Sequence, residues 1–209
     1  CRASHDPAAA PARILVLAED GNYRASMDEI TRSAEALGAG DFGSVSKVGF
    51  CVTWKFRRVD FGHVALKEAS VETRGDDNTN TMETAINFEA LEHEFHILAH
   101  LQSVDGFTPH VVELLATTGS SEGRLSGLLL GLYSCSLREH IEMGSSLSLR
   151  IEQVADCARG IAHLIKMGVI HRDIKDGNIL VDGESGRAVI ADFGCAMFWV
   201  QGQSLPSGL

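Results

Sequence analysis

Apolar and polar side chains alternate between residues 48 and 56, which is typical of a half-buried β-strand. Val48, Phe50 and Val52 occupy every second position, with smaller or polar residues between them. A turn is predicted at 60–62, where a glycine follows Asp and Phe, and a return strand is predicted through 64–67. This segment therefore predicts a β-hairpin in the first third of the chain.

Two longer segments have the spacing of amphipathic helices. From about residue 84 to 101, Leu91, Phe95 and Leu98 repeat at i, i+4 and i+7, and the polar segment 71–80 before them is predicted as a loop. A second helix is predicted from about residue 149 to 166 and is ended by Gly168. Its apolar stripe, which we expect to be buried, consists of Ile151, Val154, Ala158, Ile161 and Ile165.

A second, shorter hairpin is predicted further along the chain. The β-rich triplets 179–181 and 188–190 flank a cluster of turn formers at 182–186. Such a hairpin brings Asn178 and Asp192 side by side. Amide and carboxylate oxygens from two chain segments can converge on Mg²⁺, so this pair is a candidate metal site.

Glycines at 38, 40 and 43 form the pattern G-x-G-x-x-G, which permits a tight turn with backbone N–H groups close to phosphates. A dinucleotide-binding site would need a helix after this pattern, and a P-loop would need Gly-Lys-Ser/Thr. Gly43 is instead followed by Ser44 and then by a predicted strand. The pattern therefore indicates neither of these two sites.

Lys67 and Glu94 form a candidate ion pair. Ala65 and Lys67 share one face of the return strand, because side chains alternate along a strand. Glu94 projects from the apolar stripe of the first helix, where a carboxylate is costly unless it is paired. Lys67 is therefore its expected counter-ion.

Three histidines on the same predicted helix raise the question of a metal site. His96 and His100 are an i, i+4 pair, but no cysteine cluster or third ligand accompanies them. His93 and His96 do not have the H-E-x-x-H spacing. We interpret all three as partly exposed helical histidines.

Four motifs occur in a fixed order. Residues 64–67 read Val-Ala-Leu-Lys, 171–178 read His-Arg-Asp-Ile-Lys-Asp-Gly-Asn, and 192–194 read Asp-Phe-Gly, all after the glycine pattern. In this order they resemble the motifs of protein kinases. The resemblance covers about residues 34 to 197, with no A-P-E motif and none of the family's remaining C-terminal helices. We therefore interpret the chain as a fragment or as a reduced member.

The resemblance implies an α+β, two-lobed protein-kinase-like fold. It consists of a small antiparallel β lobe with one key helix and an incomplete, mainly helical C-terminal lobe. The implied division is an unassigned N-terminal extension at 1–32, with a possible short strand at 14–17, an N-lobe at 33–132 and a partial C-lobe at 133–209. In the apolar segment 125–132, Leu130 would be the gatekeeper. Residues 131–133 would offer backbone hydrogen bonds to adenine before a helix begins at 137–141.

The same resemblance implies roles for single side chains. Asp173 would orient the substrate hydroxyl or accept its proton, with Lys175 near the γ-phosphate, and Lys67 would be held by Glu94. The metal ligands for Mg²⁺ or Mn²⁺ would be Asn178 and Asp192. The residues expected to bind ATP are Leu37, Gly38, Ala39, Gly40, Asp41, Phe42, Gly43, Val45, Ala65, Lys67, Leu130, Gly131, Leu132, Tyr133 and Leu180.

The implied substrate is a protein Ser or Thr hydroxyl, because Lys175 lies two residues after Asp173, as in serine/threonine-directed members. Two alternatives stay open. One is a non-catalytic nucleotide-binding or scaffold fragment. The other is a kinase-like small-molecule phosphotransferase, which Lys175 and the full glycine pattern disfavour.

The composition of the chain disfavours some classes of partner. The chain has 18 Lys and Arg against 28 Asp and Glu, a net charge of −10, which disfavours nucleic acid or an anionic membrane as a partner. Its five cysteines show no paired spacing, so a reducing, intracellular compartment is expected. No apolar run approaches the length of a membrane span.

Overall fold

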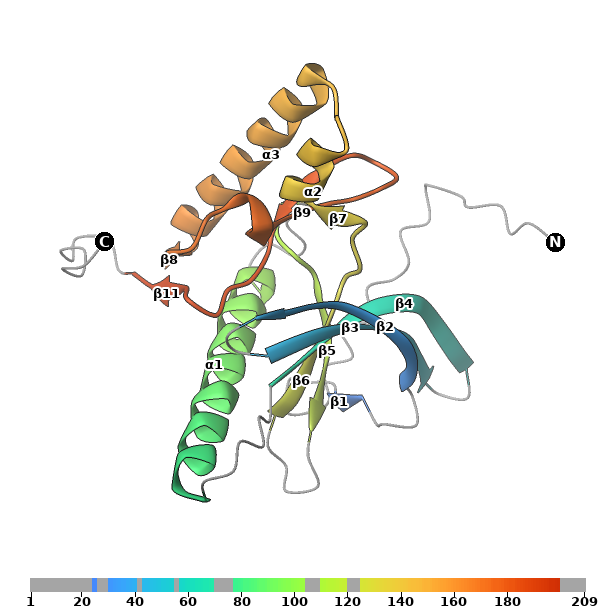
Figure 1. The fold of residues 1–209 in the computed structure, drawn as a ribbon, viewed down its shortest axis with the longest axis vertical. Coiled ribbons are helices and arrows are strands. Elements are labelled where there is room, and N and C mark those ends of the chain that lie inside the picture. The colour runs from blue at the N-terminus through green and yellow to red at the C-terminus, as the bar shows by residue number, and fades with distance from the viewer. Residues whose placement is uncertain are drawn as a thin grey trace.

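The computed structural model describes residues 24–25, 30–40, 43–54, 57–69, 77–103, 110–119 and 125–199. These residues form two parts, stacked one above the other in Figure 1. One part is a sheet with a long helix, and the other holds two helices and short strands. This is the two-lobed α+β arrangement expected from the sequence. The possible strand at 14–17 lies outside the described residues.

The first part is a six-stranded sheet. Its strands lie in the order β1 (Arg24–Ala25), β5 (Leu114–Gly119), β6 (Leu125–Leu130), β4 (Arg57–Ala69), β3 (Gly43–Trp54) and β2 (Ile30–Gly40). All neighbours are antiparallel except β1 and β5. The sheet therefore places β4 at its centre, between the β2–β3 hairpin and β6.

The turn predicted at 60–62 is wrong, because β4 runs straight through these residues. Phe50 pairs with Gly62 and Cys51 pairs with Asp60, so Phe61 is an extra residue in the ladder. Gly62 has a φ of 68°, a conformation that glycine adopts without steric cost. The glycine therefore makes a β-bulge within a strand, where we had predicted a reversal of the chain.

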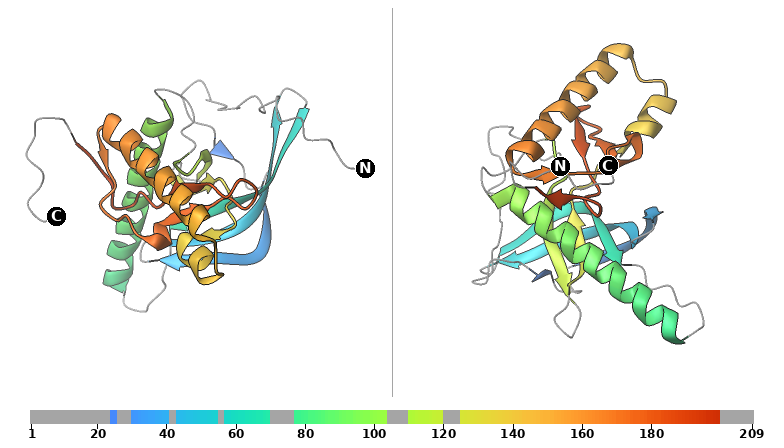
Figure 2. Two further views of the ribbon diagram at one scale, coloured as in Figure 1. Left: turned by 90° about the horizontal axis from the view of Figure 1, so that it is seen from above. Right: turned by 90° about the vertical axis from the view of Figure 1, so that its left-hand side faces the viewer.

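Helix α1 (Asp77–Ser103) packs across one face of the sheet, as the right view of Figure 2 shows. It begins earlier than the predicted residue 84, inside the segment predicted as a loop. Asp, Asn and Thr, which suggested a loop there, are also the residues that helix N-termini favour. Leu91 and Leu98 are buried and Glu92 is exposed, so the predicted inward face is the observed one.

The second part contains helices α2 (Leu137–Glu142) and α3 (Leu147–Lys166). Ser136 and Glu139 cap the start of α2 reciprocally, each accepting a hydrogen bond from the other's backbone N–H. The remaining elements are β7 (Cys135–Ser136), β8 (Val169–Ile170), the 3-10 turn η2 (Asp176–Asn178), β9 (Ile179–Val181), β10 (Ala188–Ile190) and β11 (Met197–Phe198).

The β9–β10 hairpin has the predicted bounds. Its turn is held by Asp182, whose Oδ1 accepts hydrogen bonds from the backbone N–H groups of Glu184 and Ser185 at 3.0 and 2.7 Å. A short acceptor side chain of this kind stabilises a local reversal. The hairpin places residues 178 and 191 next to each other, with Ala191 N donating to Asn178 O at 2.8 Å.

The prediction that the apolar stripe of α3 is buried is wrong. Ile151, Val154 and Ile165 are 62%, 65% and 61% exposed, whereas Gln153 is fully buried and Leu164 is 2% exposed. Periodicity identified the stripe correctly, but it could not tell which face the rest of the chain covers. Over the part of the chain that the structure describes, α3 turns its polar side toward β10.

Gly160 explains how α3 packs on that side. A Cβ at this position would lie 2.8 Å from Ile190 Cδ1 and 2.9 Å from His110 O, so only glycine permits the close approach. One turn earlier, the buried Asp156 accepts from Ala188 N at 3.1 Å and from Arg159 at 2.8 Å. These bonds satisfy a carboxylate that would otherwise be costly to bury.

One core cluster joins the two parts. It includes Leu98 of α1, Leu128 of β6, Ile190 of β10 and Phe193. The cluster therefore contains residues of both parts. It packs α1 against the segment that follows β10. Among the helices that the structure describes, none has both the length and the apolar character needed to cross a membrane.

Candidate functional site

The glycine-rich segment joins β2 to β3. Gly40 and Gly43 form the last pair of the ladder, and the predicted residues Asp41 and Phe42 between them lie outside the described residues. A Cβ on Gly38 would meet nothing within 4 Å, so space is open beside the backbone there. Val45 pairs with Lys67 of β4, which places the loop next to the lysine.

Lys67 lies between two carboxylates. Its Nζ is 2.6 Å from Glu94 Oε2 and 2.8 Å from Asp192 Oδ1. Burial acts to lower the pKa of Lys67, but the charges of Glu94 and Asp192 outweigh it, so the pKa stands above its ordinary value. Lys67 is therefore charged and links α1 to the segment after β10.

Glu94 is almost completely buried, with 1% of its surface exposed. Its second oxygen, Oε1, accepts a hydrogen bond from Phe193 N at 3.2 Å. Both carboxylate oxygens are therefore engaged, as a buried charge requires. This contact also fixes the Asp-Phe-Gly segment against α1.

Asp192 has a positive φ of 63°, which is unusual for a residue with a side chain. Burial acts to raise the pKa of its carboxyl, but the neighbouring Lys67 charge prevails and holds this pKa below the ordinary value. The next residue, Phe193, is fully buried, and the centroid of its ring lies 4.8 Å from that of the His171 ring. The sequence did not predict the contact of Asp192 with Lys67, because nothing in their spacing indicates it.

In the loop after β8, two predicted side chains bind the carboxylate of a third, Asp173. Asp173 Oδ2 accepts from Lys175 Nζ at 2.7 Å and from Asn178 Nδ2 at 2.8 Å. The hydrogen bond from Lys175 is the main cause that holds the pKa of Asp173 below its ordinary value. Asn178 uses its amide nitrogen here, which leaves its Oδ1 as the atom that can coordinate a cation. Arg172, next to Asp173, has a φ of 69°.

His171 connects the loop after β8 to the segment that follows β10. Its Nε2 donates to Ala191 O at 2.9 Å, and its Nδ1 accepts from Asp173 N at 3.3 Å. One ring nitrogen donates and the other accepts, so the imidazole is neutral in this geometry. Burial lowers the pKa of His171, which is consistent with this form.

The predicted adenine-binding residues lie along the connection from β6 to β7. Leu130 is buried and pairs with Ala65 of β4. Gly131 N donates to Glu113 O at 2.8 Å, so only the carbonyl of Gly131 is left to bind a ligand. Leu132, Tyr133 and Leu180 are partly buried and pack against the core cluster.

A divalent cation has only part of its ligand set here. The described residues contain no group of three or more His, Cys, Asp or Glu side chains that could hold a metal. Asn178 and Asp192 offer two oxygen ligands, and Mg²⁺ in such sites is completed by waters and substrate phosphates. These two side chains fit a cation that arrives with a phosphate ligand.

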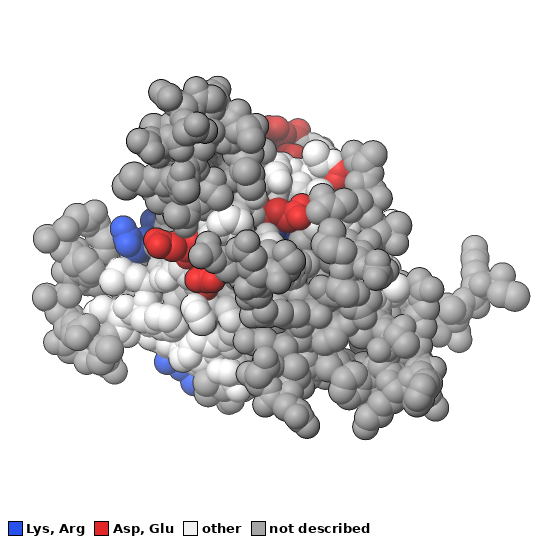
Figure 3. All heavy atoms as spheres, turned by 90° about the horizontal axis from the view of Figure 1, so that it is seen from below, with Lys and Arg blue, Asp and Glu red and all other residues white. Residues whose placement is uncertain are grey.

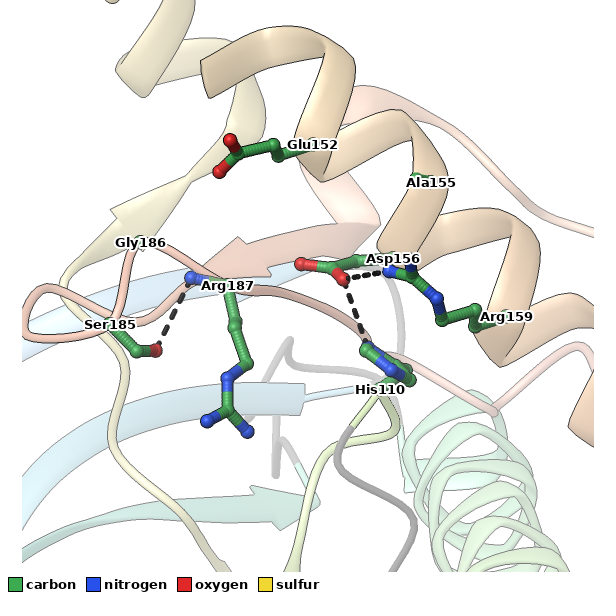
Figure 4. Close-up of a pocket in the computed structure, with 8 residues that line it drawn as sticks. All are labelled: His110, Glu152, Ala155, Asp156, Arg159, Ser185, Gly186 and Arg187. Atoms are coloured by element: carbon green, nitrogen blue, oxygen red, sulfur yellow. Dashed lines mark hydrogen bonds and ion pairs between the residues drawn. The ribbon is translucent and has the colours of Figure 1, made fainter. Parts of the chain in front are cut away.

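A separate cavity of about 430 Å³ lies between α3 and the β9–β10 turn. Figure 4 shows the residues that line it. None of the site residues predicted from the sequence lines it. Asp156 lies at its centre, where it binds Arg159 and has His110 Nδ1 at 3.5 Å. These groups join α3 to His110, which precedes β5 and whose backbone O accepts from Ile190 N of β10 at 2.9 Å. The cavity therefore lies at a structural junction.

Figure 3 shows one face of the molecule, where the described acidic and basic side chains lie in small separate groups among uncharged ones. On this face the described residues form no extended patch of one sign.

Comparison with known proteins finds similarity to protein kinases. The family model described as Protein kinase domain matches residues 31–208. Phytosulfokine receptor 2 from Arabidopsis thaliana is 30% identical over 197 residues, which cover 89% of this chain and 17% of that protein.

Two further relatives are named as serine/threonine-protein kinases. Dst3 from Dictyostelium discoideum is 32% identical over 184 residues, covering 85% of this chain and 30% of that protein. Mitochondrial PINK1 from Rattus norvegicus is 36% identical over 83 residues, covering 38% of this chain and 14% of that protein. The chain spans less than a third of the length of each of these relatives.

Proposed function

Because this chain belongs to the protein kinase family, we propose that it transfers the γ-phosphate of ATP to a Ser or Thr hydroxyl of a protein. The observation that carries the proposal is the position of Lys67, within 2.8 Å of both Glu94 and Asp192. Two relatives are named as serine/threonine kinases, and Lys175 supports the same substrate class.

The chain's own residues divide into three groups by role. Lys67, held by Glu94, binds the α- and β-phosphates, and the backbone of the glycine-rich segment covers them. Ala65 and Leu180 enclose the adenine, with Leu130 behind it and backbone groups of 131–133 toward it. Asn178 Oδ1 and the Asp192 carboxylate hold Mg²⁺ or Mn²⁺, which when bound neutralises the phosphate oxygens.

Asp173 acts at the transfer step. The hydroxyl oxygen of the substrate forms a bond to the γ-phosphorus, the bond from that phosphorus to the β-phosphate oxygen breaks, and ADP leaves. Asp173 orients this hydroxyl and takes up its proton, while Lys175 places positive charge near the transferred group. Lys175 and Asn178 keep Asp173 ionised and in place through the two hydrogen bonds to Oδ2.

The first test is Mg²⁺-dependent ATP binding by the purified chain, followed by a transfer assay. Asp173→Ala should abolish transfer and leave ATP affinity nearly unchanged, because Asp173 contacts the acceptor and not the nucleotide. Asp176→Ala is the matched control, since Asp176 lies in the same loop and forms an exposed ion pair with Arg138 of α2. Transfer that survives in Asp173→Ala would contradict the role of Asp173.

A second candidate is a nucleotide-binding module without transfer. The exposed apolar stripe of α3 favours it, because large exposed apolar faces mark interaction surfaces. ATP binding without transfer by the folded chain would support this alternative. Transfer to a small-molecule acceptor with none to protein would instead indicate a small-molecule phosphotransferase.

We also propose an intracellular location. The proposed domain division is an N-terminal extension at 1–32, an N-lobe at 33–132 and a partial C-lobe at 133–209.

A further inference from the structure

Two histidines of α1 contact backbone carbonyls of the helical part. His93 Nε2 lies 2.6 Å from Ala196 O, and His100 Nε2 lies 3.0 Å from Met167 O. A carbonyl oxygen can only accept, so both imidazoles donate an N–H there. His93 and His100 are partly exposed, as predicted, whereas His96 between them is exposed.

The two contacts lie along one side of the helix. His93 and His100 are seven residues apart, two turns, which separates them by about 10.5 Å along the axis. The ring of His100 also packs edge-on against Phe198, with the ring centroids 5.1 Å apart. The helix is thus fixed at two points, and a pair of points limits both its rotation and its tilt.

The carbonyls belong to segments that lead to the catalytic residues. Ala196 lies two residues after Gly194, and β11, which follows it, pairs with β8 immediately before His171. Met167 caps the C-terminal end of α3, one residue before the turn into β8. Both histidines therefore connect α1 to the ends of the β8–β11 pair, whose strands lie just before the catalytic loop and just after the Asp-Phe-Gly segment.

We propose that His93 and His100 are positioning residues that hold α1 where Glu94 reaches Lys67. Glu94 follows His93 directly, so a rotation of α1 that breaks the His93–Ala196 bond also moves the Glu94 carboxylate. Movement of residues 195–198 is in turn transmitted to α1. This role in catalysis rests on the proposed kinase activity, whereas the docking of α1 does not.

His93→Leu, His93→Gln and His96→Leu separate this role from general stability. Leucine cannot donate, whereas the amide nitrogen of glutamine can occupy the place of Nε2. His96→Leu is the matched control on the exposed side of the same helix. Backbone amide exchange of residues 195–199 should become about tenfold faster in His93→Leu, and should match the wild type in His93→Gln and His96→Leu.

Steady-state kinetics provide the second readout. In His93→Leu we expect kcat to fall about tenfold while KM for ATP stays within about twofold, because fewer molecules have Glu94 in place. His93→Gln should restore kcat to within about twofold of the wild type. A defect that does not depend on the donated hydrogen bond, such as altered packing, would not be rescued by glutamine.

The outcomes are separable. Equal exchange at 195–199 in His93→Leu and the wild type would overturn the inference. A wild-type chain that transfers no phosphate would contradict the proposed function and leave the exchange result standing. If His93→Leu does not fold, His100→Leu tests the second contact: faster exchange at 167–170 supports the inference, and unchanged exchange there overturns it.

Discussion

Lys67 neutralises two carboxylates at once, and only one of them is deeply buried. Glu94 is 1% exposed, whereas the Asp192 side chain is 44% exposed and can be hydrated. If the lysine is lost, Asp192 can still be hydrated, whereas Glu94 is left as a buried charge. The stability of this cluster depends mainly on the Lys67–Glu94 pair.

Lys67→Met should lower the free energy of unfolding by about 3–5 kcal/mol, because Glu94 is left buried and unpaired. The double variant Lys67→Met with Glu94→Leu should recover most of that loss, since an apolar pair replaces two buried charges. Urea unfolding of both single variants and the double variant measures the coupling. Additive losses would contradict this account.

The burial of His171 predicts how stability depends on pH. Because its pKa is lower in the folded chain than the ordinary value of about 6.5, the unfolded chain takes up a proton first as pH falls. The contribution of neutral His171 to the free energy of unfolding is therefore fully present above about pH 6.5, and it is lost as pH falls through the pKa of the folded chain. It has a slope of at most about 1.4 kcal/mol per pH unit.

His171→Gln should flatten this slope, because glutamine can still donate to Ala191 O but does not titrate. Unfolding by urea at several pH values between 5 and 7 measures the difference. An identical slope in both proteins would mean that His171 is not the group responsible.

Single-residue prediction succeeded where one element decides the outcome. The position of Glu94 follows from the helical repeat, because a carboxylate on the inward stripe needs a counter-ion. The contact of Asp192 with Lys67 depends on a backbone φ of 63° and on two segments 125 residues apart. Neither local pattern nor propensity encodes such a meeting, so it had to be observed.

At the scale of elements, α3 has two apolar sets with different surroundings. Leu164 is 2% exposed and belongs to the core cluster, whereas its neighbour Ile165 is 61% exposed. Both lie in the last turn and a half of the same helix. The pair therefore offers a direct comparison of buried and exposed apolar side chains.

Leu164→Ala should cost about 2–5 kcal/mol, because it leaves a cavity in the core. Ile165→Ala should change the free energy of unfolding by no more than about 0.5 kcal/mol, because its side chain already contacts solvent. Chemical denaturation of the two variants under the same conditions compares them. A large loss in Ile165→Ala would show that something covers this face in solution.

Element bounds were predictable where the signals that set them are local. The β9–β10 hairpin was predicted residue for residue, since its turn formers and β-rich triplets act locally. The bulge at Gly62 was mistaken for a turn, because a glycine with φ > 0 serves both. The covered face of α3 depends on close packing at Gly160, which periodicity does not report.

At the scale of the whole molecule, the proposed ligand site spans both parts. Lys67 belongs to the sheet, and Asn178 and Asp192 belong to the other part. A ligand that contacts all three adds a link between the parts beyond the core cluster. Binding should therefore stabilise the molecule as a unit.

With Mg²⁺ and ATP at 100 times the dissociation constant, the free energy of unfolding should rise by about 2.7 kcal/mol. Thermal unfolding monitored separately in each part should shift in both. ATP without the cation, and the Asp192→Ala variant with it, should give smaller shifts. A shift confined to the sheet would mean that the nucleotide does not bridge the two parts.

The positive φ angles of Arg172 and Asp192 have a consequence for evolution of this chain. A residue with a side chain in that conformation costs on the order of 1–3 kcal/mol, and glycine avoids most of this cost. Selection for thermal stability or expression alone should therefore enrich Asp192→Gly, which removes the carboxylate proposed for metal binding. Improved folding and lost activity would then arise from the same mutation, so a stability screen on this chain needs a functional filter.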